Sequence, residues 1–193
     1  GRRTGTASAM AAAEYIADEF ARLGLKPGFP AAATKSKNQA STRFFQTFPY
    51  VGGLELGKNN ILVLGSTDRA TLKVGEDWLP LGISTNAQIE SANAVFVGYG
   101  LTVSDLKHDD YAGANVSGRV AIAFAGTPDG DNPHGQFARY NDVRWKAIAA
   151  RNAGAKALLV IASETNFKDD RLSRLRYDNS AGDAGLPVAV ISR

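Results

Sequence analysis

One strand–helix–strand pattern in the second half of the chain limits its possible folds more than any other feature. The apolar run Val120–Phe124 has the length of a buried strand, residues 142–152 follow a helical pattern, and residues 158–161 form a second strand-sized apolar run. A strand, a helix and a strand in this order predict a parallel βαβ unit. Residues 187–191 add another apolar run, so we expect a β-rich α/β fold.

The helix predicted within this unit has recognisable ends and an apolar side. Asn141 or Asp142 supplies a side chain of the type that caps a helix start. Trp145, Ile148 and Ala149 recur at helical spacing, which predicts that this side faces the sheet.

A second helix is predicted near the start of the chain, over residues 8–24. Ser8 can cap it, and the apolar side chains at helical spacing are Ile16, Phe20 and Leu23. Residues 28–42 are rich in Ala, Pro, Ser, Thr, Asn and Lys, which is typical of a linker or an exposed loop.

The middle of the chain is expected to be mostly strands. The predicted strand regions are residues 44–48, 60–64, 71–91 and 94–98. Within 71–91 the candidate buried positions are Leu72, Val74, Trp78, Leu79 and Leu81. Residues 94–98 and 120–124 are continuously apolar, so we expect strands buried on both faces of a sheet.

The charge distribution argues against a nucleic-acid partner. The chain has 22 Lys and Arg against 19 Asp and Glu, and the signs alternate along residues 168–174. A nucleic-acid-binding surface would gather basic residues on one face, so we interpret these charges as a solvated surface. No apolar run reaches the length of about 20 residues that a membrane-spanning helix needs, and we expect no membrane span.

The sequence contains no recognisable catalytic or metal-binding motif. There is no Cys, and the two histidines, His108 and His134, lie outside any His-Glu-x-x-His or His-x-Asp arrangement. His108 precedes Asp109 and Asp110, but adjacent side chains rarely converge on one ion, which favours a polar turn. We therefore predict no catalytic residue and no metal ligand in this chain.

Two glycine-containing segments are incomplete nucleotide-binding motifs. Residues 52–59 match a phosphate-binding loop except at Asn59, which lacks the hydroxyl that would bind magnesium. Gly98 and Gly100 begin a dinucleotide-binding motif, but Val103 stands where a third glycine is needed. Residues 52–59 are interpreted as a hairpin turn, and the segment of residues 98–100 is rejected as a dinucleotide-binding motif.

Segments spread over nearly the whole chain resemble a known family. Residues 1–6 (GRRTGT) and 23–28 (LGLKPG) resemble the start of bacterial zinc aminopeptidases related to glutamate carboxypeptidase. Further segments are similar, in order, to the protease-associated domain inserted in those enzymes: FVGYG (96–100), DDYAG (109–113), VSGRV (116–120), WKA (145–147), AGAKALLV (153–160) and LPVAVIS (186–192).

The resemblance implies an organisation and a role. Residues 1–43 would be a helix and linker that belong to a peptidase domain. Residues 44–193 would be the protease-associated domain, with a β-sheet or barrel core flanked by helices. The family's zinc ligands begin with a His-x-Asp motif downstream of that domain, so this chain by itself is expected to be inactive. The parent protein is expected to be a zinc metallo-aminopeptidase, secreted or periplasmic, in which the catalytic peptidase domain is the partner of this region.

The resemblance also directs attention to one loop. In the glutamate carboxypeptidase branch, the loop between the strand and the helix of the βαβ unit faces the substrate; here it spans residues 127–141. The polar residues in it, which we take as candidates for contact with a peptide or protein substrate, are Asp129, Asp131, His134, Arg139 and Tyr140. Arg139 is the first candidate, because a guanidinium pairs with a carboxylate through two hydrogen bonds.

A second hypothesis remains open at this point. Protease-associated domains also occur as free-standing modules that bind a partner protein or a sorting signal. The N-terminal helix favours the peptidase hypothesis, because its apolar stripe fits a helix that packs against a peptidase domain.

Overall fold

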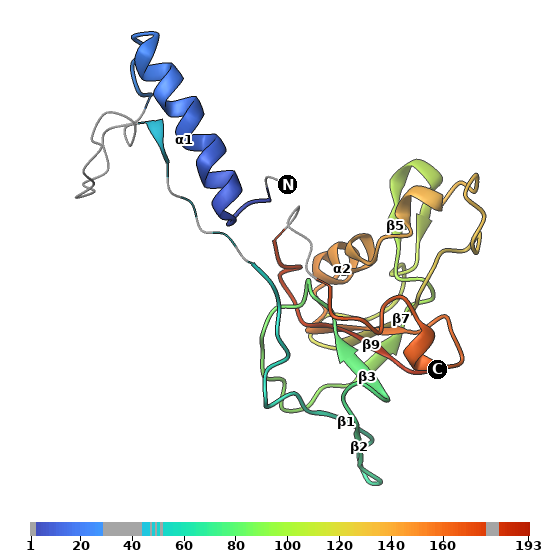
Figure 1. Cartoon of the computed structure of the whole chain (residues 1–193). Helices are drawn as coiled ribbons and strands as arrows, with labels where there is room; N and C mark the ends of the chain where they lie inside the picture. Colours follow the sequence, from blue (N-terminus) through green and yellow to red (C-terminus); the bar gives the residue numbers. More distant parts are fainter. Residues whose placement is uncertain (1–2, 29–43, 47, 49, 51, 177–181) are drawn as a thin grey trace. The chain divides into compact units, whose positions relative to one another are not determined.

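The computed structural model describes residues 3–28, 44–46, 48, 50, 52–176 and 182–193 (Figure 1). The chain divides into two compact units, Gly1–Gly52 (unit 1) and Gly53–Arg193 (unit 2). This boundary lies later than the predicted division after residue 43. The linker predicted over residues 28–42 lies almost entirely outside the described residues.

Unit 1 contains helix α1, Ala7–Arg22, close to the predicted range. Its cap is Thr6 and not Ser8, which lies inside the first turn. Thr6 has an extended backbone (φ −99°, ψ 154°), and its side-chain oxygen accepts a hydrogen bond from the amide of Ala9 at 3.3 Å. A residue before the helix can offer its oxygen in this way, whereas a residue already in the helix cannot. Gly24, at the end of the predicted range, has φ 72° and terminates the helix.

An aromatic segment of unit 1 packs against α1 instead of forming a strand. None of the described residues within the predicted strand 44–48, which are 44–46 and 48, is in a strand. The ring of Phe44 instead meets the ring of Phe20 edge-on, with centroids 5.6 Å apart. Aromatic residues favour strands only where a sheet offers them neighbours, and here α1 supplies the neighbours.

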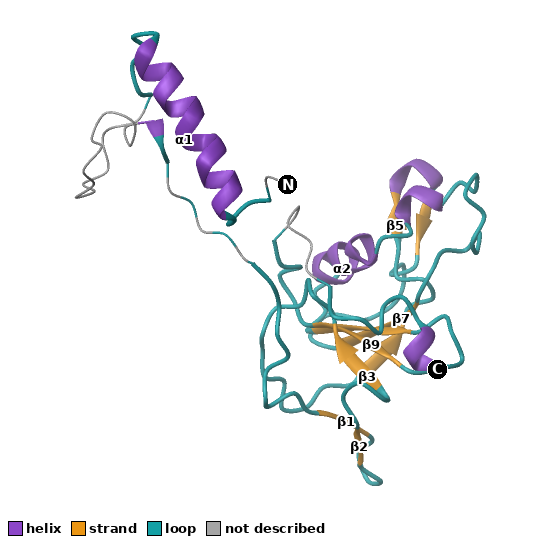
Figure 2. Cartoon of the chain, in the orientation of Figure 1, coloured by secondary structure: helices purple, strands orange, loops and turns teal. Residues whose placement is uncertain are grey.

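Unit 2 is built on a five-stranded sheet with the order β3-β9-β8-β7-β4 (Figure 2). Four strands are parallel: β4 (Ala94–Phe96), β7 (Val120–Phe124), β8 (Ala157–Ile161) and β9 (Val188–Ile191). Strand β3 (Trp78–Pro80) pairs with β9 in the antiparallel direction. The predicted mixed α/β fold, mostly β, is confirmed.

The predicted βαβ unit is present. Strand β7 leads into helix α2, Val143–Asn152, and α2 leads into β8, which pairs with β7 in parallel. Asp142 caps α2, as one of the two predicted alternatives, and its carboxylate accepts a hydrogen bond from the amide of Arg144 at 2.8 Å. None of the described helices is long and apolar enough to cross a membrane.

Helix α2 faces the sheet with a different side from the predicted one. Trp145 is 46% exposed and Ile148 is 39% exposed, although both were predicted to be buried. The buried residues of α2 are Lys146, Ala147, Ala149 and Ala150. Small side chains let the helix backbone come close to Ala121 and Ala123 of β7 in the main core, which large side chains would prevent.

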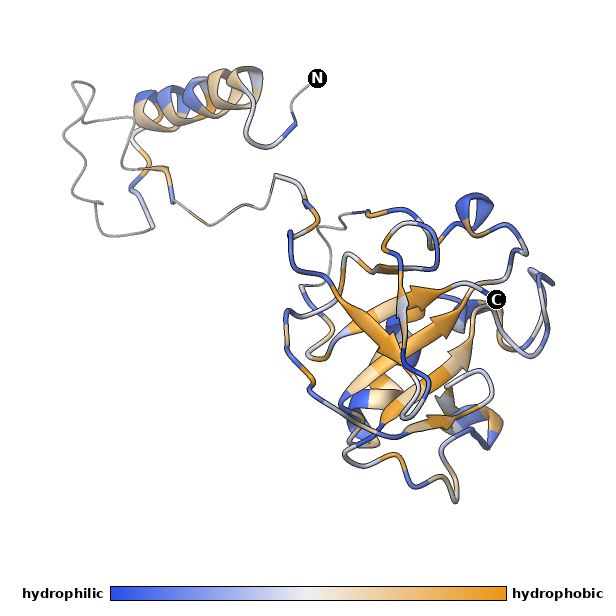
Figure 3. Cartoon of the chain, turned by 90° about the horizontal axis from the view of Figure 1, so that it is seen from below, coloured by the Kyte–Doolittle hydropathy of each residue, from blue (hydrophilic) through white to orange (hydrophobic). Residues whose placement is uncertain are grey.

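The opposite face of the sheet is covered only in part. A hairpin of β1 (Leu62–Leu64) and β2 (Ala70–Leu72) places Leu62 and Leu72 against this face. The buried sheet residues there are Trp78, Leu159 and Ala189. At the β4 edge, Phe96 and Phe124 stack edge-on yet remain 53% and 40% exposed. The prediction of burial on both faces is therefore wrong for β4 and for the end of β7, although the strands are uniformly apolar (Figure 3).

A small hairpin that the sequence did not predict follows β4. It consists of β5 (Thr102–Val103), a short 3-10 helix (η2, Ser104–Leu106) and β6 (His108–Asp109). Lys107 joins the helix to β6 in the left-handed conformation, with φ 52°. Leu101 and Val103 are buried here in a separate small core with Tyr140.

The charged segment after β8 is not simply a solvated surface. It contains a short 3-10 helix, Phe167–Asp169 (η4), followed by Asp170, which is only 1% exposed. The interpretation of residues 168–174 as solvated is therefore wrong for Asp170. Alternating charge in a sequence cannot reveal that one carboxylate turns inward to bind backbone amides.

Candidate functional site

The candidate site is the loop that follows β7, because it lies where the carboxyl ends of parallel strands meet. In open α/β sheets, ligands bind outside these ends. The loops that follow β4 and β7 both leave the sheet at this edge, and the second of them contains residues 127–141.

Hydrogen bonds within the chain give this loop a defined shape. Thr127 is 1% exposed, and its hydroxyl donates to the carbonyl oxygen of Gly130 at 3.3 Å. The carboxylate of Asp129 accepts from the amide of Phe137 at 2.8 Å, across eight positions of sequence. The loop is thus a folded element and not an unstructured connection.

Asp129 and His134, two of the predicted contact residues, differ in position. Asp129 is half-buried, and its carboxylate is used to close the loop. A side chain at Gly135 would collide with it, since an added Cβ would lie 2.6 Å from the Asp129 Cβ. His134 is exposed, and its amide donates to the side chain of Asn132 at 3.0 Å. Asp131 is also exposed.

Arg139 and Tyr140 come last in the loop and are in contact. Both lie in a short 3-10 helix, Ala138–Tyr140 (η3). The guanidinium of Arg139 lies 4.8 Å from the centre of the Tyr140 ring and donates to Asp105 at 2.7 Å. The hydrogen bond to Asp105 raises the pKa of Arg139 above its usual value, so its charge is permanent. The Arg139 side chain remains exposed.

Tyr140 anchors this end of the loop in the small core. It is 9% exposed, and its ring meets the ring of Trp145 edge-on with centroids 5.3 Å apart. Of the predicted contact residues, the structure therefore joins Arg139 and Tyr140. It turns Asp129 inward and leaves the His134 side chain exposed.

A buried cluster beside the loop was missed by sequence reasoning. Lys146 of α2 is 1% exposed, and its Nζ donates to the carbonyl oxygens of Tyr99 at 2.6 Å and of Gly126 at 2.7 Å. Burial lowers the pKa of Lys146 to about 8, with Asp110 opposing the shift and Arg171 adding to it. The only sequence signal for this cluster is that Lys146 shares the buried side of α2 with Ala147, Ala149 and Ala150.

Asp110 and its neighbours complete this cluster. The carboxylate of Asp110 accepts from the amide of Leu101 at 3.0 Å and lies 3.0 Å from Nε2 of His108. The hydroxyl of Tyr111 is buried and has no hydrogen-bond partner among the described residues, and burial raises the pKa of this phenol. His108 packs edge-on against Phe137, with ring centroids 4.9 Å apart, so the β6 segment contacts the loop of residues 127–141.

The described residues do not supply a metal site. No group of three or more His, Asp or Glu residues that could hold an ion lies within them. The zinc that the resemblance implies for a parent enzyme therefore finds no fitting ligand set in this part of the chain. The loop presents an exposed, positively charged guanidinium, which contacts Asp105 and the Tyr140 ring.

Comparisons with known proteins give little further information. No family model matches the chain, and no curated protein matches it. Among solved structures, the chain is weakly similar to an aminopeptidase from Aneurinibacillus sp. strain AM-1, with 18% sequence identity and a TM-score of 0.46. The match covers 70% of this chain and 25% of the aminopeptidase, so the chain spans about a quarter of that protein's length.

Proposed function

We propose that this chain is the non-catalytic accessory region of a zinc-dependent aminopeptidase or other exopeptidase of the extracytoplasmic space. In this proposal, unit 1 docks on the catalytic domain, and the loop of residues 127–141 borders the path of a peptide substrate. The sequence resemblance, which extends over nearly the whole chain, supports the family. The structure supports the two roles as follows.

The observation that carries the proposal is that the described residues of unit 1 form almost no core. Among its described residues, Ala17 alone is buried. The predicted stripe of Ile16, Phe20 and Leu23 is 49%, 40% and 62% exposed. Apolar residues aligned along one helix side in this way indicate a surface that another protein region covers.

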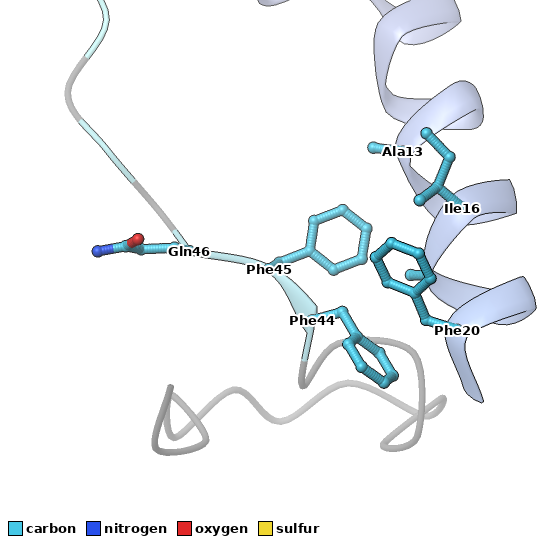
Figure 4. A pocket seen from close by; sticks show the side chains of 7 residues that line it. Ala13, Ile16, Phe20, Phe44, Phe45 and Gln46 are labelled. Carbon is cyan, nitrogen blue, oxygen red and sulfur yellow. The ribbon is translucent and has the colours of Figure 1, made fainter. Parts of the chain in front are cut away.

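An open, mostly apolar groove in unit 1 supports the proposed docking role. It is lined by residues of α1, among them Ile16 and Phe20, and by Phe44, Phe45 and Gln46 (Figure 4). The rings of Phe20, Phe44 and Phe45 gather at its centre. An apolar side chain from a neighbouring domain would fill it and complete a small core.

The loop of unit 2 supports the second role. Arg139 keeps its charge and its exposure while Asp105 and the Tyr140 ring hold it in one direction. A guanidinium held in this way can bind a peptide carboxylate or a carbonyl oxygen without ordering a flexible side chain first.

The test compares the parent protein with the 193-residue chain. In the parent protein, Phe20→Ser is expected to lower the temperature at which zinc-dependent aminopeptidase activity is lost, because burial of a phenylalanine contributes about 1.5–3 kcal/mol. In the isolated chain, the same change is expected to leave the unfolding of unit 2 unaltered. Tyr15→Ser is the matched control, since Tyr15 lies on α1 outside the groove and is 68% exposed.

The possible results separate the hypotheses. A parent protein without zinc-dependent peptidase activity would overturn the proposal in favour of a free-standing binding module. A parent enzyme in which Phe20→Ser and Tyr15→Ser behave alike would remove the docking role of α1. Reproducible zinc-dependent turnover of aminoacyl substrates by the isolated chain would show that the region is not merely accessory.

A further inference from the structure

Lys146 joins two loops that are far apart in the sequence. Its Nζ donates at 2.6 Å to the carbonyl oxygen of Tyr99, in the loop after β4. It donates at 2.7 Å to the carbonyl oxygen of Gly126, in the loop after β7. With 1% of the residue exposed, one buried amino group therefore holds the two loops together at the carboxyl edge of the sheet.

The positive charge of Lys146 is poorly compensated at this position. Among the described residues, no carboxylate accepts a hydrogen bond from its Nζ. Asp110 attracts the charge but already binds the amide of Leu101, and Arg171 repels it. The Tyr99 ring, with its centre 5.6 Å from Nζ, adds a weak attraction. The buried ammonium ion is therefore stabilised mainly by two neutral carbonyl groups.

We propose that Lys146 is a proton-operated latch: loss of its proton favours the closed arrangement of the two loops, and gain of the proton loosens them. A neutral amine still has two N–H groups, one for each carbonyl oxygen. Deprotonation therefore keeps both hydrogen bonds while removing the free-energy penalty of a buried charge.

The direction of the pH effect follows from the two pKa values. Burial lowers the pKa of Lys146 from 10.5 to about 8 in the closed form, whereas a lysine that reaches water in an open form keeps its ordinary value. Below pH 8 both forms are charged, and the closed form bears the full burial penalty. Between the two values closure releases a proton, so the closed-to-open ratio rises with pH, by up to about 300-fold.

The latch acts on the loop that the proposed function places beside the substrate, but its test does not depend on that function. The 193-residue chain is labelled with ¹³C at lysine Cε and at alanine methyl groups. The Lys146 Cε signal is expected to titrate near pH 8. Relaxation dispersion of the methyl groups of Ala125 and Ala138, both in the loop after β7, reports the population of the open form.

We expect the open population to fall at least about tenfold between pH 7 and pH 9.5. Lys146→Met should abolish this dependence, whereas Lys156→Met, which alters an exposed lysine beside β8, should preserve it. Titration of Lys146 near 10.5, an open population that does not fall with pH, or an equal fall in Lys146→Met would each overturn the latch. If Lys146→Met does not fold, the wild-type titration and dispersion decide the question alone.

Discussion

Asp170 provides the sharpest test of how the carboxyl edge of the sheet is held together. Its Oδ2 accepts hydrogen bonds from the amides of Ser163 at 2.7 Å and Glu164 at 3.0 Å. Its Oδ1 accepts one from the amide of Leu172 at 2.7 Å. One buried carboxylate thus joins the start of the segment that follows β8 to the turn around Leu172, and Asp170→Asn removes its charge while keeping its size.

The expected loss of stability follows from these contacts. A hydrogen bond to a charged group contributes about 1.5–3 kcal/mol, roughly twice the contribution of a neutral one. An asparagine in its best orientation keeps two of the three bonds in neutral form and directs its amide group at the Leu172 amide, which is also a donor. We therefore expect Asp170→Asn to lower the free energy of unfolding by about 3 kcal/mol, and the melting temperature by about 6–12 °C.

The assay is urea unfolding monitored by tryptophan fluorescence. Both tryptophans of the chain, Trp78 and Trp145, lie in unit 2, so the signal reports this unit alone. Asp169→Asn is the matched control, because Asp169 is exposed and accepts only from the Asn166 side chain at 2.7 Å among the described contacts. A difference between the two variants below about 1 kcal/mol would refute the structural role assigned to the Asp170 carboxylate.

Two further predictions concern the neighbouring loops. Gly100→Ala should destabilise unit 2 by about 2 kcal/mol more than Gly113→Ala in the same assay. Both glycines have positive φ, but only at Gly100 would the new Cβ come within 2.9 Å of the Ala123 Cβ. Equal losses of stability would show that backbone strain alone matters. In the aminopeptidase proposed as the parent protein, Arg139→Ala should lower kcat/KM for peptides without changing zinc content or melting temperature. Arg174→Ala, at another exposed arginine, should leave kcat/KM unchanged. Unchanged kinetics of the Arg139→Ala variant on several peptide lengths would reduce the loop to a spacer.

The candidate site could be predicted in location but not in construction. A loop of unusual length between a strand and a helix marks residues 127–141 as a special segment. Sequence alone places both Asp129 and Arg139 among the candidates for substrate contact, with Arg139 first, and cannot tell which of them is used inside the loop. In the structure the Asp129 carboxylate closes the loop by accepting a hydrogen bond from the amide of Phe137. Arg139 instead points outward and donates to Asp105.

Lys146 shows why the buried cluster was not predicted. A lysine on a helix is normally expected at the surface. It is buried here because its long side chain, with a donor at its tip, reaches the carbonyl oxygens of both Tyr99 and Gly126. The two acceptor residues lie 47 and 20 positions before Lys146 in the sequence, and no local sequence pattern relates residues so far apart.

The sequence by itself determined the elements whose signal is local. Apolar runs of strand length produced β7, β8 and β9, the side chain of Asp142 set the start of α2, and Gly24 set the end of α1. Tertiary structure decided which faces of these elements are buried. Phe96 and Trp145 are exposed although they are large and apolar. At Phe96, the sheet face at the β4 edge is not covered by other described elements of unit 2. At Trp145, the alanines on the other side of α2 let the helix pack closer to the sheet than tryptophan would. Burial depends on the shape of the opposite surface, and that surface comes from distant parts of the chain.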